Sequence, residues 1–314
     1  MAKTTVLITG CSDGGLGSAL ALGLHKTGHF RVFATARNLS KLSDVKAAGI
    51  ETLSLDVLST PSIEACVLEV RALTNGTLDM LVNNAGAGSF GALTDTSLSD
   101  ARTLFDLNVW SGLAVTQAFL PLLLRSQRPG GAVIVNHTSV SSVMASPFIA
   151  LYGASKAAMA MLTVALRAEL RPFGVRVVDL KSGSTKSNIG VNTIRASGTT
   201  GFPEKSLYYA ARGWLNELYT GSPFEDQAIA SDVWAKNVVA HLEKKEPPNT
   251  VWVGAFAWTV WFASNFLPSR LAEKLARDVS GVDKVERSIM EYGREKAIVD
   301  AYGKNSFGHE LFAP

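Results

Sequence analysis

Three residues with acid–base chemistry are spaced so that one fold could bring them together. Tyr152 and Lys156 lie four residues apart, and Ser139 precedes the tyrosine by thirteen residues. If residues 150–172 form a helix, Tyr152 and Lys156 share one face, one turn apart. An ammonium group near a phenol stabilises the phenolate, so we expect Lys156 to lower the pKa of Tyr152 from about 10 toward neutrality. Such a tyrosine can protonate a carbonyl oxygen or take a proton from an alcohol.

The Tyr152/Lys156 pair by itself has a second interpretation, a surface tyrosine beside a solvated lysine. The chain has 6 tyrosines and 30 basic residues, so this spacing arises readily by chance. The elements around the pair must decide between the two interpretations.

Short apolar or β-branched runs alternate with longer helical patterns along the chain. Strands that are apolar throughout indicate a parallel sheet covered by helices on both faces. We therefore predict an α/β fold with a doubly wound parallel sheet of about seven strands. The predicted strands are Thr4–Thr9, Arg31–Ala36, Glu51–Leu55, Leu78–Val82, Ala132–Asn136, Val175–Leu180 and Val251–Val253. The predicted helices are Leu16–Lys26, Leu39–Ala47, Ser62–Leu73, Ala101–Arg125, Leu151–Pro172 and Ala228–Lys244.

Composition limits the classes of function. The chain has 314 residues, 47% of them hydrophobic and 18% charged, which allows one large domain or two small ones with a sizeable core. A net charge of +3 is too small to indicate a nucleic-acid-binding protein. The cysteines, Cys11 and Cys66, form no disulfide framework, and the 5 histidines have no metal-ligand spacing. We expect no metal and a reducing compartment.

A glycine-rich turn, residues 9–17, joins the first predicted strand to the first predicted helix and reads Thr-Gly-Cys-Ser-Asp-Gly-Gly-Leu-Gly. This is the setting of a dinucleotide site, where glycines let a pyrophosphate approach the backbone and a helix N-terminus faces the anion. The alternative is a turn of the same kind without a ligand. We assign the cofactor contacts of this turn to Gly10, Ser12, Gly15, Leu16 and Gly17.

The end of the second predicted strand selects the cofactor. No acidic residue stands where an NAD site holds the ribose 2′-hydroxyl. Arg37 instead offers a guanidinium fork that suits a 2′-phosphate, and Ser12 can donate to the same group. NADP(H) is therefore favoured over NAD(H), the alternative being an exposed arginine at a strand end. Asp56 follows the third strand, where it can accept from an adenine amino group or cap an ordinary turn.

Taken in order, these elements resemble the classical short-chain dehydrogenase/reductase family, which has a Rossmann-type fold. A chance occurrence of the whole set is negligible, so the surface interpretation of the Tyr152/Lys156 pair is rejected. The matching residues, spread over about residues 4–190, are Thr9–Gly17, Asp56, Asn83-Asn84-Ala85-Gly86, Asn108, Ser139 and Tyr152-x-x-x-Lys156.

The resemblance implies a role for each matching residue. Tyr152 is the acid/base, Lys156 binds the nicotinamide ribose, and Ser139 polarises the substrate carbonyl. Asn108 helps to hold a water that relays protons, and the Asn83–Gly86 turn steadies the sheet beside the cofactor. The expected catalytic residues are thus Asn108, Ser139, Tyr152 and Lys156. The expected cofactor contacts are Gly10, Ser12, Gly15, Leu16, Gly17, Arg37, Asn38, Asp56, Val57, Asn83, Asn84, Ala85, Gly86, Tyr152, Lys156, Gly183, Thr185 and Ser187.

The chain departs from the family pattern in two places. The glycine-rich turn is one residue longer than usual, which leaves open whether Gly14 or Gly15 faces the pyrophosphate. After the sixth strand, Ser182 replaces the usual proline before Gly183, and Ser187 replaces a threonine. Ser187 can still bond the nicotinamide carboxamide, whereas the loss of proline loosens the following turn.

Residues 182–227 break the strand–helix rhythm and are polar and glycine-rich, with a possible helix over 205–218. A long insertion after a late strand tends to be a lid over a binding site. Its aromatic residues either line a substrate pocket or pack the lid against the body; they are Phe202, Tyr208, Tyr209 and Trp214. Its cations have no pattern that marks a phosphate site, which favours an apolar ketone; they include Arg195, Lys205 and Arg212. Val140, Ser141 and Phe148 are further pocket candidates.

Within the family, the chain most resembles fungal-type NADPH-dependent 1-acyldihydroxyacetone-phosphate reductases, and it is similar to NADP-linked 17β-hydroxysteroid and retinol dehydrogenases. The shared features are Thr-Gly-Cys-Ser, Ala-Thr-Ala-Arg-Asn, Tyr-Gly-Ala-Ser-Lys and an aromatic tail. The leading hypothesis is an NADPH-dependent carbonyl reductase of a bulky, mostly apolar ketone, lipid-like or polyketide-like. 1-Acyldihydroxyacetone phosphate, a steroid or a retinoid is the alternative substrate. An NADP-binding sensor or scaffold without redox turnover is the alternative function.

The chain ends in an aromatic extension, residues 255–314, which follows a catalytic domain, 1–254, that includes the lid. Residues 251–267 carry no charge, and their aromatic residues fall on every helical face. The segment is too short to span a bilayer. Either it packs against the body or a partner subunit, or residues 254–267 dip into a membrane interface. The resemblance implies a cytoplasmic homodimer or homotetramer, with peripheral contact to endoplasmic reticulum or lipid droplets as the second alternative.

Overall fold

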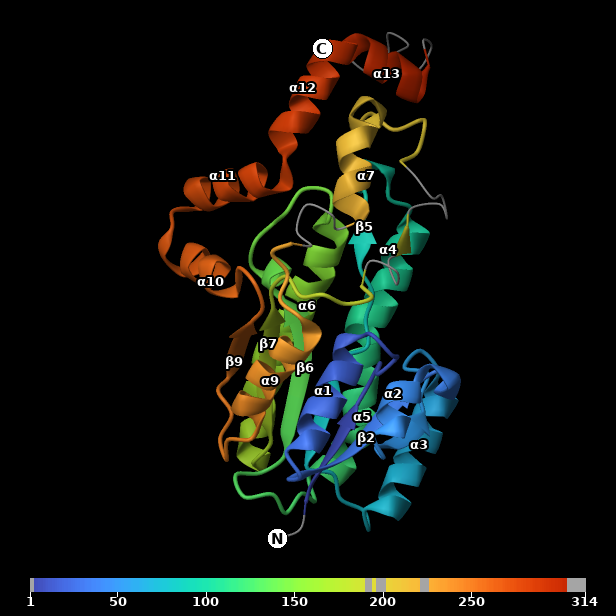
Figure 1. Cartoon of the computed structure of the whole chain (residues 1–314), viewed down its shortest axis with the longest axis vertical. Coiled ribbons are helices and arrows are strands. Elements are labelled where there is room, and N and C mark those ends of the chain that lie inside the picture. The colour runs from blue at the N-terminus through green and yellow to red at the C-terminus, as the bar shows by residue number, and fades with distance from the viewer. Residues whose placement is uncertain (1–2, 190–193, 196–201, 221–225, 304–314) are drawn as a thin grey trace.

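The computed structural model describes residues 3–189, 194–195, 202–220 and 226–303. Within this part of the chain, seven parallel strands form one sheet in the order β3-β2-β1-β4-β6-β7-β9, with helices on both faces (Figure 1). The predicted doubly wound fold is therefore confirmed. The strands are β1 Thr4–Ile8, β2 Phe30–Ala36, β3 Glu51–Ser54, β4 Met80–Asn83, β6 Val133–Ser139, β7 Arg176–Ser182 and β9 Thr250–Val253.

The strand order changes direction between β1 and β4, which are hydrogen-bonded neighbours. From β1 the chain builds outward through β2 to β3, and from β4 it builds the other way through β6 and β7 to β9. In a doubly wound sheet, this reversal opens a crevice at the carboxyl ends of the strands. The glycine-rich turn after β1 and the Asn83–Gly86 turn after β4 both lie at that edge.

Two apolar layers cover the sheet because side chains alternate between its faces. On one face, α1, α2 and α9 pack on Val6, Ile8 and Val135. On the other face, α3, α5 and α6 pack on Leu7, Leu81 and Ile134. The helices are α1 Leu16–Lys26, α2 Ser43–Ala47, α3 Thr60–Leu73, α5 Ser111–Leu123, α6 Ala150–Leu170 and α9 Ser231–Leu242.

Two predicted helices are subdivided in the structure. The segment predicted as 101–125 begins as α4 Leu98–Phe105, widens into a π-helical turn over Asp106–Trp110 and continues as α5. The segment predicted as 39–47 starts with a 3₁₀ turn, Leu39–Lys41, before α2. Apolar periodicity shows that a segment is helical but is too coarse to reveal a local change of winding.

Residues 202–220 form a compact unit around their own apolar cluster. It contains α7 Arg212–Thr220, preceded by a 3₁₀ turn at Tyr209–Ala211, so the α-helix starts later than predicted. Phe202 and Leu215 are buried against Phe148, and Tyr208 meets Phe148 edge to face, with ring centroids 5.4 Å apart. Phe202 and Tyr208 therefore pack this unit against the body, one of the two alternatives. Part of the predicted lid, 190–193, 196–201 and 221–225, lies outside the described residues.

Within residues 254–303, four helices follow β9 and arch along the molecule to the end that holds α7 (Figure 1). They are α10 Ala257–Phe266, α11 Ser269–Ser280, α12 Val282–Tyr292 and α13 Arg294–Tyr302. Val285 of α12 joins the buried cluster of α7. Trp214 of α7 donates to the Ser280 carbonyl at 3.4 Å, and the Lys284 nitrogen lies 3.4 Å from the centroid of its ring. Trp214 thus contacts the C-terminal extension.

The helix α10 has a buried face and an exposed face, and its aromatic residues gather on the exposed one, contrary to the sequence interpretation. Ala257, Val260 and Ala263 form the buried face, whereas Trp258 and Phe262 are 67% and 53% exposed. Small residues at this spacing let the helix pack closely on the body, and the larger rings then point outward. Among the described residues, no helix combines the length and apolarity needed to cross a membrane.

Candidate active site

Ser139, Tyr152 and Lys156 meet at the carboxyl end of β6. Ser139 is the last residue of β6, and Tyr152 and Lys156 lie in the first turns of α6, as their spacing predicted. Ser139 and Lys156 are buried, whereas Tyr152 is partly exposed. The Lys156 nitrogen donates to the His137 carbonyl at 2.9 Å and lies 5.8 Å from the centroid of the Tyr152 ring. A buried lysine therefore lies beside a phenol that solvent can reach.

The predicted lowering of the Tyr152 pKa is wrong for this structure. Burial raises the pKa of Tyr152 above its ordinary value of 10.0, and a hydrogen bond with Ser139 offsets this only in part. Burial also lowers the pKa of Lys156 to about 8, against the opposing charge of Asp179. Removal from water penalises the charged form of both groups, and this penalty exceeds the opposing effects of Ser139 on Tyr152 and of Asp179 on Lys156. Tyr152 is therefore a neutral phenol at neutral pH and can donate a proton.

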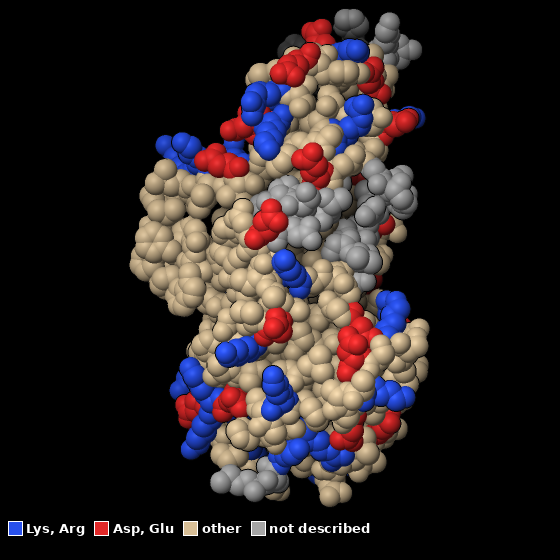
Figure 2. Space-filling view, in the orientation of Figure 1, with Lys and Arg blue, Asp and Glu red and all other residues tan. Residues whose placement is uncertain are grey.

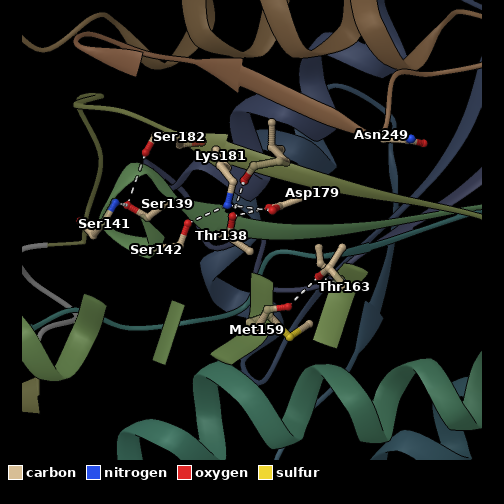
Figure 3. Close-up of polar contacts among 12 residues, drawn as sticks. Thr138, Ser139, Ser141, Ser142, Met159, Thr163, Asp179, Lys181, Ser182 and Asn249 are labelled. Atoms are coloured by element: carbon tan, nitrogen blue, oxygen red, sulfur yellow. Dashed lines mark hydrogen bonds and ion pairs between the residues drawn. The ribbon is translucent and has the colours of Figure 1, made fainter. Parts of the chain in front are cut away.

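The loop that follows Ser139 contacts a pair of charged residues that sequence reasoning missed (Figure 3). Lys181 of β7 donates to the Ser142 hydroxyl at 2.7 Å and pairs with Asp179 at 2.8 Å. The Thr138 hydroxyl donates to the same carboxylate. The sequence held one sign of this cluster: Asp179 is a charged residue inside the predicted strand Val175–Leu180, which was expected to be buried on both faces. These contacts hold the loop that follows Ser139 against β7.

Asn108 lies in the π-helical turn, and its side-chain amide joins two elements. Its oxygen accepts from the Ala87 amide, and its nitrogen donates to the Ala87 carbonyl and the Ser155 hydroxyl. Ser155 in turn donates to the Tyr152 carbonyl at 2.7 Å. Both amide hydrogens of Asn108 are thus used within the protein. Asn108 fixes the segment after β4 relative to the start of α6.

The Asn83–Gly86 turn links β4 to the glycine-rich turn. The Asn84 amide nitrogen donates to the carbonyls of Thr9 and Gly10, at 2.8 and 3.0 Å. The Thr9 hydroxyl accepts from the backbone of Asn84 and Ala85. Asn83 donates to Thr116 of α5 and to Asn136 of β6. The two turns therefore form one rigid edge, as the resemblance implied for the region beside a cofactor.

Gly14 and Gly15 have different surroundings in the glycine-rich turn. Gly15 immediately precedes α1, so the free amides at the start of the helix belong to Leu16 and Gly17. A side chain at Gly17 would meet the Asn84 amide nitrogen and the Gly10 carbonyl at 2.5 Å, so only glycine fits there. Gly14 is exposed and lies under the Asn188 side chain instead. Gly15, rather than Gly14, is thus placed at the anion-binding end of α1.

Asp13 accounts for the longer turn. Its carboxylate accepts from the Ser43 amide at 2.9 Å, from the Asp44 amide at 3.1 Å, and from the Ser43 hydroxyl. Its carbonyl accepts from Asn188 at 2.7 Å. A carboxylate at the first amides of a helix caps it, so Asp13 caps α2. Asp13 therefore ties the longer turn to α2 and to the start of the segment after β7.

The residues expected around the adenosine lie at the ends of β2 and β3. Arg37 is exposed, and no ion pair joins it to another described residue. The Asn38 side chain accepts from the Ser40 amide and hydroxyl, which starts the 3₁₀ turn. Asp56 accepts from the Leu58 amide at 3.0 Å, as the turn-cap alternative predicted, and Val57 is buried. The guanidinium fork of Arg37 is thus available to an anion.

The segment after β7 lies beside the start of α10. A side chain at Gly183 would meet the Ala255 carbonyl at 2.0 Å, so the glycine is required for close packing of the two segments. Thr185 bridges to Ile229 and its hydroxyl donates to the Gly183 carbonyl. Ser187 follows on the same segment and is partly exposed. The structure brings these three positions to the edge that holds the other cofactor candidates.

Together these features fit a nicotinamide dinucleotide. The N-terminus of α1, where Gly17 has no side chain to block the backbone amides, suits a pyrophosphate. Arg37 suits a phosphate on the adenosine ribose. Ser139, Tyr152 and Lys156 lie farther along the same strand edge, where a nicotinamide would end. Among the described residues, no group of three or more acidic, histidine or cysteine side chains is arranged to hold a metal.

Comparisons with known proteins agree on one family. The family model for short chain dehydrogenase matches residues 4–217. A short-chain dehydrogenase/reductase of Pestalotiopsis microspora is 40% identical over 288 residues, 92% of this chain and 98% of the relative. An NADPH-dependent 1-acyldihydroxyacetone phosphate reductase of Schizosaccharomyces pombe is 39% identical over 216 residues, 69% of this chain and 71% of the relative. A solved short-chain dehydrogenase from Streptomyces avermitilis superposes with a TM-score of 0.71 at 28% identity, covering 91% of this chain and 98% of that one.

Proposed function

Since the chain belongs to the short-chain dehydrogenase/reductase family, we propose that it is an NADPH-dependent carbonyl reductase of a bulky, mostly apolar ketone. The observation that carries the proposal is the neutral, partly exposed phenol of Tyr152 beside Ser139 and Lys156. Reduction of a ketone needs an acid at this point, and a phenol with a raised pKa is in the acid form.

NADPH is the cofactor that the binding edge supports. Arg37 has no partner among the described residues to compete for its guanidinium. The S. pombe relative carries NADPH dependence in its name. We assign the pyrophosphate to the amides of Leu16 and Gly17 and the 2′-phosphate to Arg37 and Ser12. When bound, NADPH supplies the hydride that reduces the ketone carbon.

The protein's own groups then act on the ketone oxygen. Ser139 donates a hydrogen bond to the oxygen and so stabilises the negative charge that develops there. Tyr152 transfers its phenolic proton to the same oxygen. Lys156, held at the His137 carbonyl, stabilises the resulting phenolate and holds the ribose. Asn108 keeps α6 in register with the segment after β4, and its contribution is to position Tyr152 through Ser155.

The test of this function is Tyr152→Phe, which removes only the transferable proton. Turnover with NADPH should fall by roughly 10²–10⁴-fold, and the dissociation constant for NADPH should change little. NADPH binding is followed by fluorescence, and turnover by the loss of reduced-nicotinamide absorbance with a ketone panel. A variant that keeps substantial turnover contradicts the acid role of Tyr152. A wild type that binds NADPH but reduces no ketone supports the sensor or scaffold alternative instead.

The substrate class follows from the lid. Its described part has an apolar cluster, and one of its cations, Arg212, stacks on Tyr209 at 4.2 Å from the ring centroid. Arg212 is therefore engaged within the protein rather than directed to a substrate phosphate. We favour a lipid-like or polyketide-like ketone over 1-acyldihydroxyacetone phosphate, and a steroid or retinoid remains in the same apolar class. A substrate screen with all of these ketones decides among them by kcat/KM.

A second proposal concerns where the enzyme works. The outer face of α10 carries Trp258, Phe262 and Phe266, which are 67%, 53% and 61% exposed. Figure 2 shows an uncharged bulge at this place, between charged surfaces above and below. Tryptophan and phenylalanine on an uncharged, protruding helix favour the boundary between lipid headgroups and acyl chains. We propose peripheral attachment to a lipid surface through residues 254–267, with the endoplasmic reticulum and lipid droplets as candidate membranes.

Flotation with neutral phosphatidylcholine liposomes tests the attachment. The wild type should float, and the variant Trp258→Ser/Phe262→Ser/Phe266→Ser should remain at the bottom of the gradient. A matched control replaces equally exposed apolar residues elsewhere, Leu68→Ser/Leu93→Ser/Phe173→Ser, and should float like the wild type. If the wild type does not float, α10 covers the body or a partner subunit instead.

We also propose a homo-oligomer, a dimer or tetramer, built on the faces of α5 and α6. Met161 and Val164 of α6 are 70% and 52% exposed, and Trp110, just before α5, is 52% exposed. Apolar groups gathered on neighbouring helices are typical of a subunit interface. Light scattering should give a mass above that of one chain for the wild type and a lower mass for Met161→Glu.

A further inference from the structure

The His137 side chain connects four elements of the fold. It projects from β6 and stacks on Trp234 of α9, with ring centroids 5.3 Å apart and an interplanar angle of 24°. Its Nδ1 lies 2.9 Å from the Asn84 side-chain oxygen, and its Nε2 lies 2.7 Å from the Ser182 hydroxyl. Trp234 also approaches Ser182, with its indole nitrogen 2.9 Å from the hydroxyl oxygen. Every polar atom of the imidazole therefore has a partner.

Trp234, Ser182, His137 and Asn84 are linked in that order by hydrogen bonds. The groups at the two ends of this row determine which atom donates in each bond. An indole N–H can only donate, so Ser182 accepts from Trp234. Among the described residues, Nε2 of His137 is the acceptor within reach of the Ser182 hydroxyl proton, so Ser182 donates to Nε2. At the other end, the Asn84 amide nitrogen donates to Thr9 and Gly10, so the Asn84 oxygen faces the ring and accepts from Nδ1. Both ends require the same neutral tautomer, with the proton on Nδ1. Burial and the nearby Lys156 charge lower the pKa of His137 to about 3, which keeps the ring neutral.

His137 is connected to two parts of the sheet edge at which we place the cofactor. Asn84 holds the glycine-rich turn through the carbonyls of Thr9 and Gly10. The backbone carbonyl of His137 accepts from the Lys156 nitrogen at 2.9 Å. His137 thus reaches the pyrophosphate end of the edge with its side chain and the nicotinamide end with its main chain. The ring tautomer affects the Asn84 contact, because the Nε2–H form would place two lone pairs face to face there.

We propose that Ser182 is a positioning residue: together with Trp234 it selects the Nδ1–H tautomer of His137, which holds Asn84 and the glycine-rich turn in the geometry that binds NADPH. The inference rests on the proposed function, because it assigns the site to this cofactor. Proline, the residue usual at position 182 in the family, has no hydroxyl and could not make this selection. At position 182 this protein therefore has a serine that hydrogen-bonds to His137 in place of a proline that restricts the backbone.

The test compares Ser182→Ala with Ser182→Thr, which keeps the hydroxyl. Ser182→Ala should weaken NADPH binding roughly tenfold, the effect of one lost buried hydrogen bond, while Ser182→Thr should stay near the wild type. Ser280→Ala is the matched control, because it removes another buried hydroxyl far from the edge, and its NADPH affinity should be unchanged. Thermal unfolding of all four proteins identifies a variant that fails to fold.

The tautomer itself is read by ¹⁵N NMR of histidine-labelled protein, which needs no bound cofactor. In the wild type, His137 should show a protonated Nδ1 and an unprotonated Nε2, and Ser182→Ala should show the Nε2–H form as well. The proposal is overturned if Ser182→Ala keeps the wild-type tautomer, or if it binds NADPH as tightly as the wild type does. A wild type that does not bind NADPH overturns the proposed function, and the NMR result then decides separately whether Ser182 selects the tautomer.

Discussion

The Lys181 nitrogen lies 2.8 Å from a carboxylate oxygen of Asp179, with the two side chains only 7% and 3% exposed. The pair contacts the loop that follows Ser139 through the Ser142 hydroxyl (Figure 3). A buried ion pair contributes little net stability, but removing one partner leaves a charge without compensation. The pair therefore makes the geometry of the active-site loop depend on two residues that do not touch the substrate.

Replacing one partner of this pair should be costly. Lys181→Met leaves Asp179 buried and unpaired, so the free energy of unfolding should fall by about 3–5 kcal/mol, measured by urea denaturation. The double variant Lys181→Met/Asp179→Leu should recover most of the loss. Arg31→Met serves as the control, because the Arg31–Glu51 pair is 36% and 40% exposed and should cost under about 1 kcal/mol. Equal losses for Lys181→Met and Arg31→Met would contradict the importance of the buried pair.

Lys156 should make stability rise with pH in the alkaline range. Its pKa is about 8 in the folded protein against an ordinary 10.5, so between these values the unfolded chain binds more protons than the folded one. The free energy of unfolding therefore increases with pH across this window. From pH 8 to 10, the wild type should gain about 2 kcal/mol relative to Lys156→Met, whose neutral side chain cannot titrate. A difference that stays flat or falls with pH would mean that Lys156 is not penalised by burial.

Arg37 should decide between the two nicotinamide cofactors. Arg37→Asp replaces the guanidinium by a carboxylate that repels a 2′-phosphate and can accept from a ribose hydroxyl. The variant should bind NADPH roughly 10–100-fold more weakly and show a preference for NADH, measured as kcat/KM with each cofactor. Lys41→Asp makes the same charge change in the adjacent 3₁₀ turn and should alter the preference far less. If Arg37→Asp still prefers NADPH, the 2′-phosphate is bound elsewhere.

The C-terminal extension should control the lid through Val285. This residue of α12 is 3% exposed within the lid cluster, and a buried valine contributes about 1.5–3 kcal/mol of local packing. Val285→Ala should loosen α7, raise KM for the ketone severalfold and leave the NADPH dissociation constant unchanged. Val279→Ala, at a position that is 48% exposed on α11, should match the wild type. Unchanged ketone kinetics for Val285→Ala would show that α12 does not support the lid.

Much of the framework is determined by local sequence. Apolar runs such as Val6–Ile8 must be buried on both faces, and the helical pattern between them leaves a doubly wound sheet as the solution. Glycine is needed at position 17 because another backbone comes within 2.5 Å of where a side chain would be. The four-residue spacing of Tyr152 and Lys156 places them on one helix face whatever surrounds the helix. These features depend on backbone geometry and periodicity, which act over a few residues.

Only the tertiary structure decided how these residues behave. The pKa of Tyr152 rises instead of falling because burial depends on what packs around it, which spacing cannot state. Asp179 and Lys181 become a buried pair, and Ser182 meets His137 and Trp234, through contacts between strands and helices far apart in the chain. Val285 joins the lid because α12 folds back over α7. Desolvation and long-range hydrogen bonds are properties of the assembled fold, and no local pattern contains them.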